Sequence, residues 1–321
     1  MPPGRVAESY VVRMNAAGQT DGWQALVAEA ETLGTTSMAA VWADGRRANW
    51  AADDDPVAEC MSVTKFVVGV VLGLAVDAGD LDHPLSEWIP EWAGDDRGAI
   101  TLRQVSMHAS GLQVLPATVV YEAESVEKLV LGLEPVEPPM TSFAYNNAAI
   151  NLIGLVASRV AGASLADLAG ERLFEPLGIE EWGWQKDPQG MPLCFAGLQL
   201  RARDLAAIGA LFLTGGARDG KRLVPPEWIA AMPPPEPTEV GVCCLVDYEW
   251  VHRSEDRVDV GPRSGFGHSG DHGQYLTIQQ GAGVSLARLR AEYDVVNPEA
   301  VWMSFPERVH EYLGPAGSLL R

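Results

Sequence analysis

Two pairs of residues with the spacing Ser-x-x-Lys could place a hydroxyl beside an amine: Ser62 with Lys65, and Ser125 with Lys128. One helical turn brings residues i and i+3 side by side. A lysine in apolar surroundings can lose its proton well below its solution pKa, because burial disfavours the charged form. A neutral amine beside a hydroxyl is a base next to a nucleophile, which is the minimum needed for acyl transfer.

The surroundings separate the two pairs. The first pair is followed by an apolar run from Phe66 to Leu74, which is typical of a helix buried on all sides. Ser125 instead lies among glutamates that would keep Lys128 charged on a solvated face. Ser62 could also be a plain N-cap with a lysine in the first turn, but a lysine there is unfavourable against the helix dipole. The first pair is therefore the candidate for chemistry.

A second segment, Tyr145-Asn146-Asn147, is the only Tyr-x-Asn in the chain and precedes an apolar helix predicted over residues 148–161. A lysine cation favours ionisation of a nearby tyrosine, and a phenolate is a competent base for a serine hydroxyl. The Asn147 amide could hold a substrate carbonyl or the lysine. The alternative is an ordinary helix start, with an asparagine N-cap and a tyrosine staple.

The third segment is Gly267-His268-Ser269-Gly270, followed by Asp271. Glycines on a strand let the backbone approach a ligand closely, and a strand N–H can complete an oxyanion hole. A Gly-x-Ser-x-Gly nucleophile turn is excluded because position 271 is Asp. A zinc site from His268 and His272 would need a helix, whereas glycines and a strand intervene. A plain hairpin turn remains the alternative.

Both strands and helices are predicted around these segments. Residues 37–43 and 47–51 read as a hairpin across Asp44-Gly45. Further strands are predicted at 242–251, 265–269, 274–279 and 284–288, and helices at 22–33, 62–79, 148–161, 202–213 and 298–313. We expect an α+β fold, with a central antiparallel sheet flanked by helices and an inserted helical domain. Residues 1–61 and 205–321 would form the sheet lobe and 62–204 the helical lobe, with the site between them.

Composition excludes several functions. A formal charge of −20 opposes binding to nucleic acid, whose phosphates would be repelled. No stretch of about eighteen apolar residues predicts a membrane span, and the first twenty residues lack the apolar core of a secretory signal. The four cysteines have no metal-ligand spacing and read as reduced core thiols. We therefore expect a cytoplasmic protein; its oligomeric state is not predicted.

In this order, the three segments resemble the serine β-lactamase and penicillin-binding-protein superfamily. The likeness is greatest to its class C-like branch of esterases, amide hydrolases, D-aminopeptidases and transacylases. Further family-like segments are Thr101–Gln104, His108–Leu112 and Leu173–Gly178, so the resemblance covers about residues 35 to 290. It implies a reaction through an acyl-enzyme, and that reaction needs no metal or organic cofactor.

The resemblance also implies roles for individual residues. Ser62 would be the acylated nucleophile, Lys65 its proton partner and Tyr145 the general base. The substrate would be held by Asn147, His268, Ser269 and Gly270, and the oxyanion by the backbone N–H groups of Ser62 and Asp271.

The third segment departs from the Lys-Thr-Gly of β-lactamases, which supplies a cation for the substrate carboxylate. Asp271 beside His268-Ser269-Gly270 would repel an anion, so efficient β-lactam hydrolysis is not expected. We expect hydrolysis of an ester or amide bond in a small molecule. The alternatives are transfer of the acyl group to an amine or alcohol, and a non-catalytic binder with the same fold. Residues 113–142 would line the pocket and set specificity.

Overall fold

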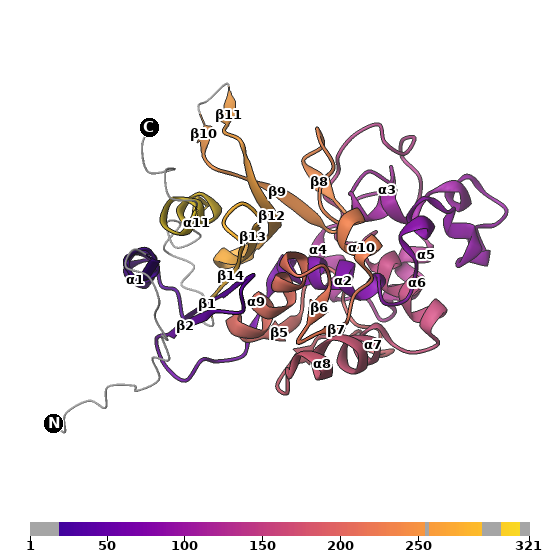
Figure 1. Cartoon of the computed structure of the whole chain (residues 1–321). Coiled ribbons are helices and arrows are strands. Elements are labelled where there is room, and N and C mark those ends of the chain that lie inside the picture. Colours follow the sequence, from indigo (N-terminus) through magenta and orange to yellow (C-terminus); the bar gives the residue numbers. More distant parts are fainter. Residues whose placement is uncertain (1–18, 254–256, 291–302, 315–321) are drawn as a thin grey trace.

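A seven-stranded antiparallel sheet forms the centre of the molecule (Figure 1). The computed structural model describes residues 19–253, 257–290 and 303–314, and the statements below concern these residues. The strand order is β2-β1-β14-β13-β12-β9-β8. The strands are β1 (Ser37–Trp42), β2 (Arg47–Ala51), β8 (Val240–Gly241), β9 (Cys244–Tyr248), β12 (Arg263–Gly270), β13 (Gln274–Gln279) and β14 (Val284–Leu289). The expected fold class is confirmed, because β1 from the first part of the chain pairs with β14 from the last.

Helices cover both faces of this sheet. On one face lie α1 (Gln19–Thr32) and α11 (Phe305–Leu313), whose apolar side chains pack with those of β13 and β14. On the other face lies α9 (Ala202–Ala210). It packs closely, because a Cβ at Gly209 would lie 2.3 Å from the Ser285 hydroxyl oxygen. Successive residues of a strand point to opposite faces, so β14 contributes side chains to both layers.

Most remaining helices gather beside the sheet around α2 (Thr64–Leu72), whose nine residues are all buried. This helix packs on α6 and α7 and also on β9 and β12 of the sheet, so it must be apolar all round, which explains its sequence. The helices around it are α3 (Leu102–Ser106), α4 (Ala117–Tyr121), α5 (Val126–Leu131), α6 (Asn151–Ala161), α7 (Leu165–Ala169), α8 (Glu175–Leu177) and α10 (Pro226–Ala231).

The remaining short strands lie outside the central sheet. They are β3 (Ala58–Glu59), β4 (Gly183–Trp184) and β5 (Leu198–Leu200) in a small sheet, and the hairpins β6 (Ala217–Arg218) with β7 (Lys221–Arg222) and β10 (Val251–Arg253) with β11 (Val258–Val260). One hydrophobic core runs from β1 through α2 to α6 and α7, and a second lies between the sheet and helices α1 and α11. The division into two lobes at residues 62 and 204 stays a prediction.

Several predicted boundaries were wrong. The helix from Ser62 ends at Leu72 instead of Gly79. At this end Trp228 Nε1 donates to the Gly69 carbonyl oxygen at 3.0 Å, and its ring packs so closely on Gly73 that a Cβ there would lie 2.3 Å from it. The predicted strand 242–251 is interrupted, so β9 ends at Tyr248 and β10 begins at Val251. The helix predicted at 148–161 begins at Asn151. The last helix begins at Phe305, and residues 298–302 of that prediction lie outside the described residues.

Within the described ranges, no single helix is long and apolar enough to cross a membrane. Helix α6 and the segment Leu165–Leu177 reach that length and composition only as a pair bent by 74°.

Candidate active site

Ser62 and Lys65 lie together where a short 3₁₀ turn, Met61–Val63, leads into α2. Lys65 Nζ is 3.0 Å from Ser62 Oγ and donates a second hydrogen bond to the carbonyl oxygen of Phe195 at 2.9 Å. The lysine side chain is fully buried. The structure thus brings the predicted nucleophile and its amine partner into direct contact.

The second Ser-x-x-Lys pair has a different role. Ser125 Oγ accepts a hydrogen bond from the backbone N–H of Lys128 at 3.3 Å, so Ser125 is the N-cap of α5. Capping of this kind satisfies one of the free N–H groups at a helix start. The same spacing therefore produces a cap at one position and a serine–lysine contact at the other.

Burial lowers the pKa of Lys65 to about 7, and nearby negative groups, including the Asp271 carboxylate, oppose this only in part. At neutral pH a large share of Lys65 is therefore the uncharged amine. An uncharged amine 3.0 Å from a hydroxyl can accept its proton.

Tyr145 completes the cluster. Lys65 Nζ lies 4.6 Å from the centroid of the tyrosine ring, so the phenol lies against the serine–lysine pair. Loss of solvent raises the pKa of Tyr145 to about 12, although the contact with Ser62 opposes the rise. The expected easier ionisation of this tyrosine was wrong, because removal of water from the phenolate outweighs help from a lysine that is itself largely neutral. Tyr145 therefore carries its proton at neutral pH.

The end of β12 lies directly against the nucleophile turn. A Cβ at Gly270 would lie 2.8 Å from the Cys60 carbonyl oxygen and 3.0 Å from the Ser62 nitrogen, so only glycine allows this approach. Met61, just before the nucleophile, has a left-handed backbone with φ of +48°. Such strained residues gather at functional sites. The oxyanion hole formed by the N–H groups of Ser62 and Asp271 stays a prediction.

His268 is buried beside Tyr145, with the two ring centroids 6.4 Å apart. Burial, aided by the nearby Lys65, lowers the pKa of His268 to about 3, so the ring is neutral. Its Nδ1 lies 2.6 Å from the Ser269 carbonyl oxygen and donates to it, which leaves Nε2 as an acceptor. This residue therefore supplies no cation to a substrate.

Asn147 does not contact the lysine through a hydrogen bond, since the hydrogen bonds of Lys65 go to Ser62 and Phe195. Its Oδ1 is buried without a hydrogen-bond partner among the described residues. The neighbouring Asn146 instead caps the turn, because its Oδ1 accepts from the N–H groups of Ala148 and Ala149. The Asn147 Oδ1 therefore has an acceptor position in reserve, and its contact with a substrate stays a prediction.

His108 also belongs to this site, although its sequence context predicted no more than a family-like segment. Its ring centroid is 4.6 Å from that of Tyr145. Its Nδ1 accepts from the N–H of Asn146 at 3.1 Å, and its carbonyl oxygen accepts from the N–H of Ala144 at 2.8 Å. His108 thus holds the backbone on both sides of Tyr145 and packs on the phenol between them. It touches none of the reacting atoms and is a positioning residue.

We expect His108→Ala to lower kcat about 3- to 10-fold, because the tyrosine loses a ring contact worth about 0.5–1.5 kcal/mol. It should also lower the free energy of unfolding by about 1–3 kcal/mol, because the buried N–H of Asn146 loses its acceptor. His108→Asn keeps an acceptor and tolerates the left-handed backbone, whose φ is +56°. Urea unfolding should show stability recovered in this variant while kcat stays low. An unchanged kcat in both variants would show that the ring does not position Tyr145.

In the described part of the chain, no group of three or more His, Cys, Asp or Glu side chains is arranged to hold a metal ion. The four cysteines, Cys60, Cys194, Cys243 and Cys244, are buried free thiols, as expected for core residues. Burial raises the pKa of Cys194 and of Cys243 to about 12, so neither is a thiolate near Lys65.

Known proteins resemble this chain to different extents. The chain is 26% identical over 213 residues to 6-aminohexanoate-dimer hydrolase of Paenarthrobacter ureafaciens, a match of 60% of this chain and 54% of that protein. It is 28% identical over 130 residues to D-aminopeptidase of Cereibacter sphaeroides, covering 37% of this chain and 25% of that protein. The chain thus spans about half the length, or less, of these curated relatives.

A solved family VIII carboxylesterase superposes with a TM-score of 0.72 at 19% identity, covering 93% of this chain and 98% of that chain. This likeness shows a shared fold. The family model described as β-lactamase matches residues 23–290, a range that holds all the site residues described above. The chain therefore belongs to the β-lactamase family.

Proposed function

We propose that this protein is a serine hydrolase that cleaves an ester or amide bond of a small molecule through an acyl-enzyme on Ser62. The observation that carries the proposal is the hydrogen bond of 3.0 Å between Lys65 Nζ and Ser62 Oγ in a buried environment. The hydrolase names of the curated relatives support the same reaction class.

The first step is attack on the substrate carbonyl. Ser62 Oγ forms a bond to the carbonyl carbon while its proton passes to the neutral amine of Lys65. The carbonyl oxygen gains a negative charge, which the N–H groups of Ser62 and Asp271 would stabilise. The Asn147 Oδ1 acceptor would hold an N–H of an amide substrate.

The second step breaks the bond to the leaving group. Tyr145, protonated at neutral pH, gives its proton to the departing oxygen or nitrogen and takes one back from Lys65, which is thereby returned to the neutral amine. The acyl group stays on Ser62. A water molecule then attacks the ester, and the same two residues move its proton to Ser62 Oγ as the acid leaves.

The neutral state of His268 opposes a β-lactam as the preferred substrate. A β-lactam antibiotic carries a carboxylate, and no cation is supplied by the third segment, where Asp271 adds a negative charge. An ester or amide without an anionic group near the reacting carbonyl fits this site better.

The proposal is tested by covalent labelling with an alkyl fluorophosphonate, which reacts with activated serines. We expect one adduct per chain, mapped by mass spectrometry to Ser62. Ser125 serves as an internal control, because its hydroxyl is bound to a backbone N–H and has no neutral amine beside it. No adduct, or equal labelling of both serines, would contradict the proposal and favour a binder that shares the fold.

A further inference from the structure

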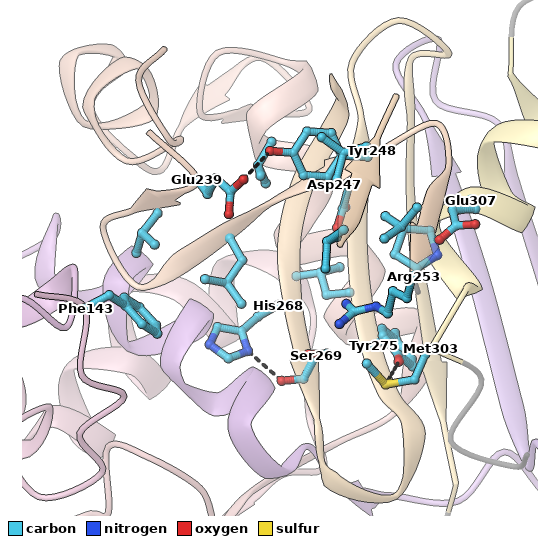
Figure 2. Close-up of a pocket in the computed structure, with 18 residues that line it drawn as sticks. Phe143, Glu239, Asp247, Tyr248, Arg253, His268, Ser269, Tyr275, Met303 and Glu307 are labelled. Carbon is cyan, nitrogen blue, oxygen red and sulfur yellow. Dashed lines mark hydrogen bonds between the residues drawn. The ribbon is translucent and has the colours of Figure 1, made fainter. Parts of the chain in front are cut away.

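A cavity of about 630 Å³, within the size range of small-molecule sites, lies between β9, the hairpin β10–β11, the end of β12 and the start of α11. Figure 2 shows Phe143 at one side, His268 and Ser269 in the middle, and Met303 at the far side. Most of the described side chains that line it are apolar. Its size and its lining suit an uncharged organic ligand.

The cavity begins beside the reacting groups. Phe143 lies two residues before Tyr145, and the ring centroid of His268 is 6.4 Å from that of the tyrosine; both Phe143 and His268 line the cavity. In the proposed mechanism Tyr145 gives its proton to the leaving group. The leaving half of the substrate is therefore the half that lies next to the cavity.

From there the cavity reaches the other face of the sheet. The pairing of β12 with β9 ends at Gly267, so among the described strands the edge of β12 at His268 and Ser269 has no neighbour on this side. His268 shares the face of Phe266, whose ring stacks on a phenylalanine of α2. Ser269 lies opposite Tyr275, on the face covered by α11. Since both residues line the cavity, it passes round this open edge to the α11 face.

The hairpin β10–β11 forms an apolar wall at the far end. Val251 pairs with Val260, and Val258 lies two residues before Val260 on the same face. All three valines line the cavity, whereas His252 and Asp259, which pair between them, point to the other face and are not part of the lining. Val258 and Val260 are 56% and 39% exposed, and a bound apolar group would cover them.

The carboxyl groups of the lining have partners within the chain. Asp247 Oδ2 accepts from the hydroxyl of Thr277 at 2.6 Å, and Glu239 Oε1 accepts from the hydroxyl of Tyr248 at 2.9 Å. A third carboxyl group, at the start of α11, lies within electrostatic reach of the Arg253 guanidinium. Burial raises the pKa of Asp247 to about 7, because little water reaches this wall. These groups therefore do not require a charged ligand.

We propose that this cavity binds the leaving group of the substrate and selects one with an uncharged, flexible hydrocarbon chain. The chain starts at the oxygen or nitrogen that Tyr145 protonates, passes His268 and Ser269 round the open edge of β12, and ends against the valines of the hairpin. The inference rests on the proposed function, since it assigns part of the substrate of that same site. The substrate class is an ester or amide of a long-chain aliphatic alcohol or amine.

The test compares two series of esters that begin with ethyl acetate. Butyl and hexyl acetate lengthen the alcohol, whereas ethyl butyrate and ethyl hexanoate lengthen the acyl group and are their isomers. We expect kcat/KM to rise about two- to fourfold for each methylene added to the alcohol, as for a methylene removed from water. Hexyl acetate should exceed ethyl hexanoate about tenfold or more, because isomers of similar hydrophobicity differ in which half is long.

Val260→Asp should lower the ratio of kcat/KM for hexyl acetate to that for ethyl acetate about tenfold or more, because a charge then lies where the chain ends. Val160→Asp is the matched control, since it makes the same change at a valine of α6 that is 41% exposed and outside the cavity lining. Val258→Asp, on the same face as Val260, is the second variant if the first unfolds. A ratio that survives these changes, or that falls equally in the control, would overturn the inference.

The outcomes separate the inference from the proposed function. Equal kcat/KM values within each isomer pair, or faster cleavage of ethyl hexanoate, with labelling at Ser62 intact, overturn the cavity assignment while the hydrolase stands. If no ester is cleaved, calorimetric binding of hexanol and butanol decides. Tighter binding of hexanol that is lost in Val260→Asp supports the inference, and any other result overturns it.

Discussion

Ser62→Ala is expected to lower kcat/KM for an activated ester by about 10⁴- to 10⁶-fold, the range seen when a nucleophilic serine is removed. The reason is that the acyl group then has no oxygen to form a bond with, and the neutral amine of Lys65 has no hydroxyl to deprotonate. Initial rates with a p-nitrophenyl ester measure the effect. Stability should change little, because the substitution removes one oxygen from a part-buried contact.

Ser125→Ala provides the matched control for this experiment. It should leave kcat/KM unchanged within about twofold and lower the free energy of unfolding by about 0.5–2 kcal/mol, because α5 loses its N-cap. Ser62→Ala should therefore change activity and hardly stability, whereas Ser125→Ala should change stability and hardly activity. Activity retained in Ser62→Ala would show that Ser62 is not the nucleophile.

This contrast shows what sequence could predict about the site. The Ser-x-x-Lys spacing alone gave two candidates, since helical geometry treats both alike. The apolar run after Lys65 predicted burial, and burial is the cause of its lowered pKa. The acidic surroundings of Lys128 predicted a charged lysine on a solvated helix face, and Lys128 is exposed; the capping role of Ser125 was not predicted.

The sheet could be predicted for a similar reason. Strands β13 and β14 are continuous, buried and rich in branched or aromatic residues, and their bounds differ little from those predicted. The end of α2 could not be predicted, because Gly73 is where the ring of Trp228 arrives from far along the chain. The sequence offers both Gly73 and Gly79 as helix ends, and a side chain far along the chain favours the first.

The same limit applies to the chemistry of Tyr145. Its neighbours in sequence say nothing of His108, which reaches it across 37 positions through a left-handed backbone. Whether the pKa of Tyr145 rises or falls depends on how much solvent the folded chain removes from the phenol. This effect and that of the nearby lysine oppose each other, and their sizes cannot be compared from sequence. The cavity lined by Phe143, Asp247 and Glu307 could not be predicted from any single segment either, because these residues come from three separate parts of the chain.

Lys65→Met should lower kcat/KM by about 10²- to 10⁴-fold, the usual contribution of a general base. Methionine fills similar space but cannot accept a proton. In the unaltered protein, kcat/KM should rise with pH through about 7, as Lys65 becomes the neutral amine. That rise should disappear in Lys65→Met. It should persist in Asp247→Asn, although Asp247 also has a pKa of about 7, because that carboxyl does not move the reacting proton.

The same substitution should raise stability at neutral pH. The pKa of Lys65 is about 7 in the folded chain, below the ordinary value of 10.5. Between these two values the unfolded chain binds the proton more tightly, so stability is lost as pH falls from about 10.5 towards 7. Methionine has no proton to bind and avoids that loss. Thermal unfolding should give a higher Tm for Lys65→Met at pH 7, with the gain shrinking as pH approaches 10.5. Lys128→Met, whose lysine lies on the exposed start of α5, should show neither the gain nor the loss of activity. A Lys65→Met protein that is no more stable at pH 7 and still gains activity through pH 7 would show that this amine is charged in the resting site, and the proton transfer assigned to it would fail.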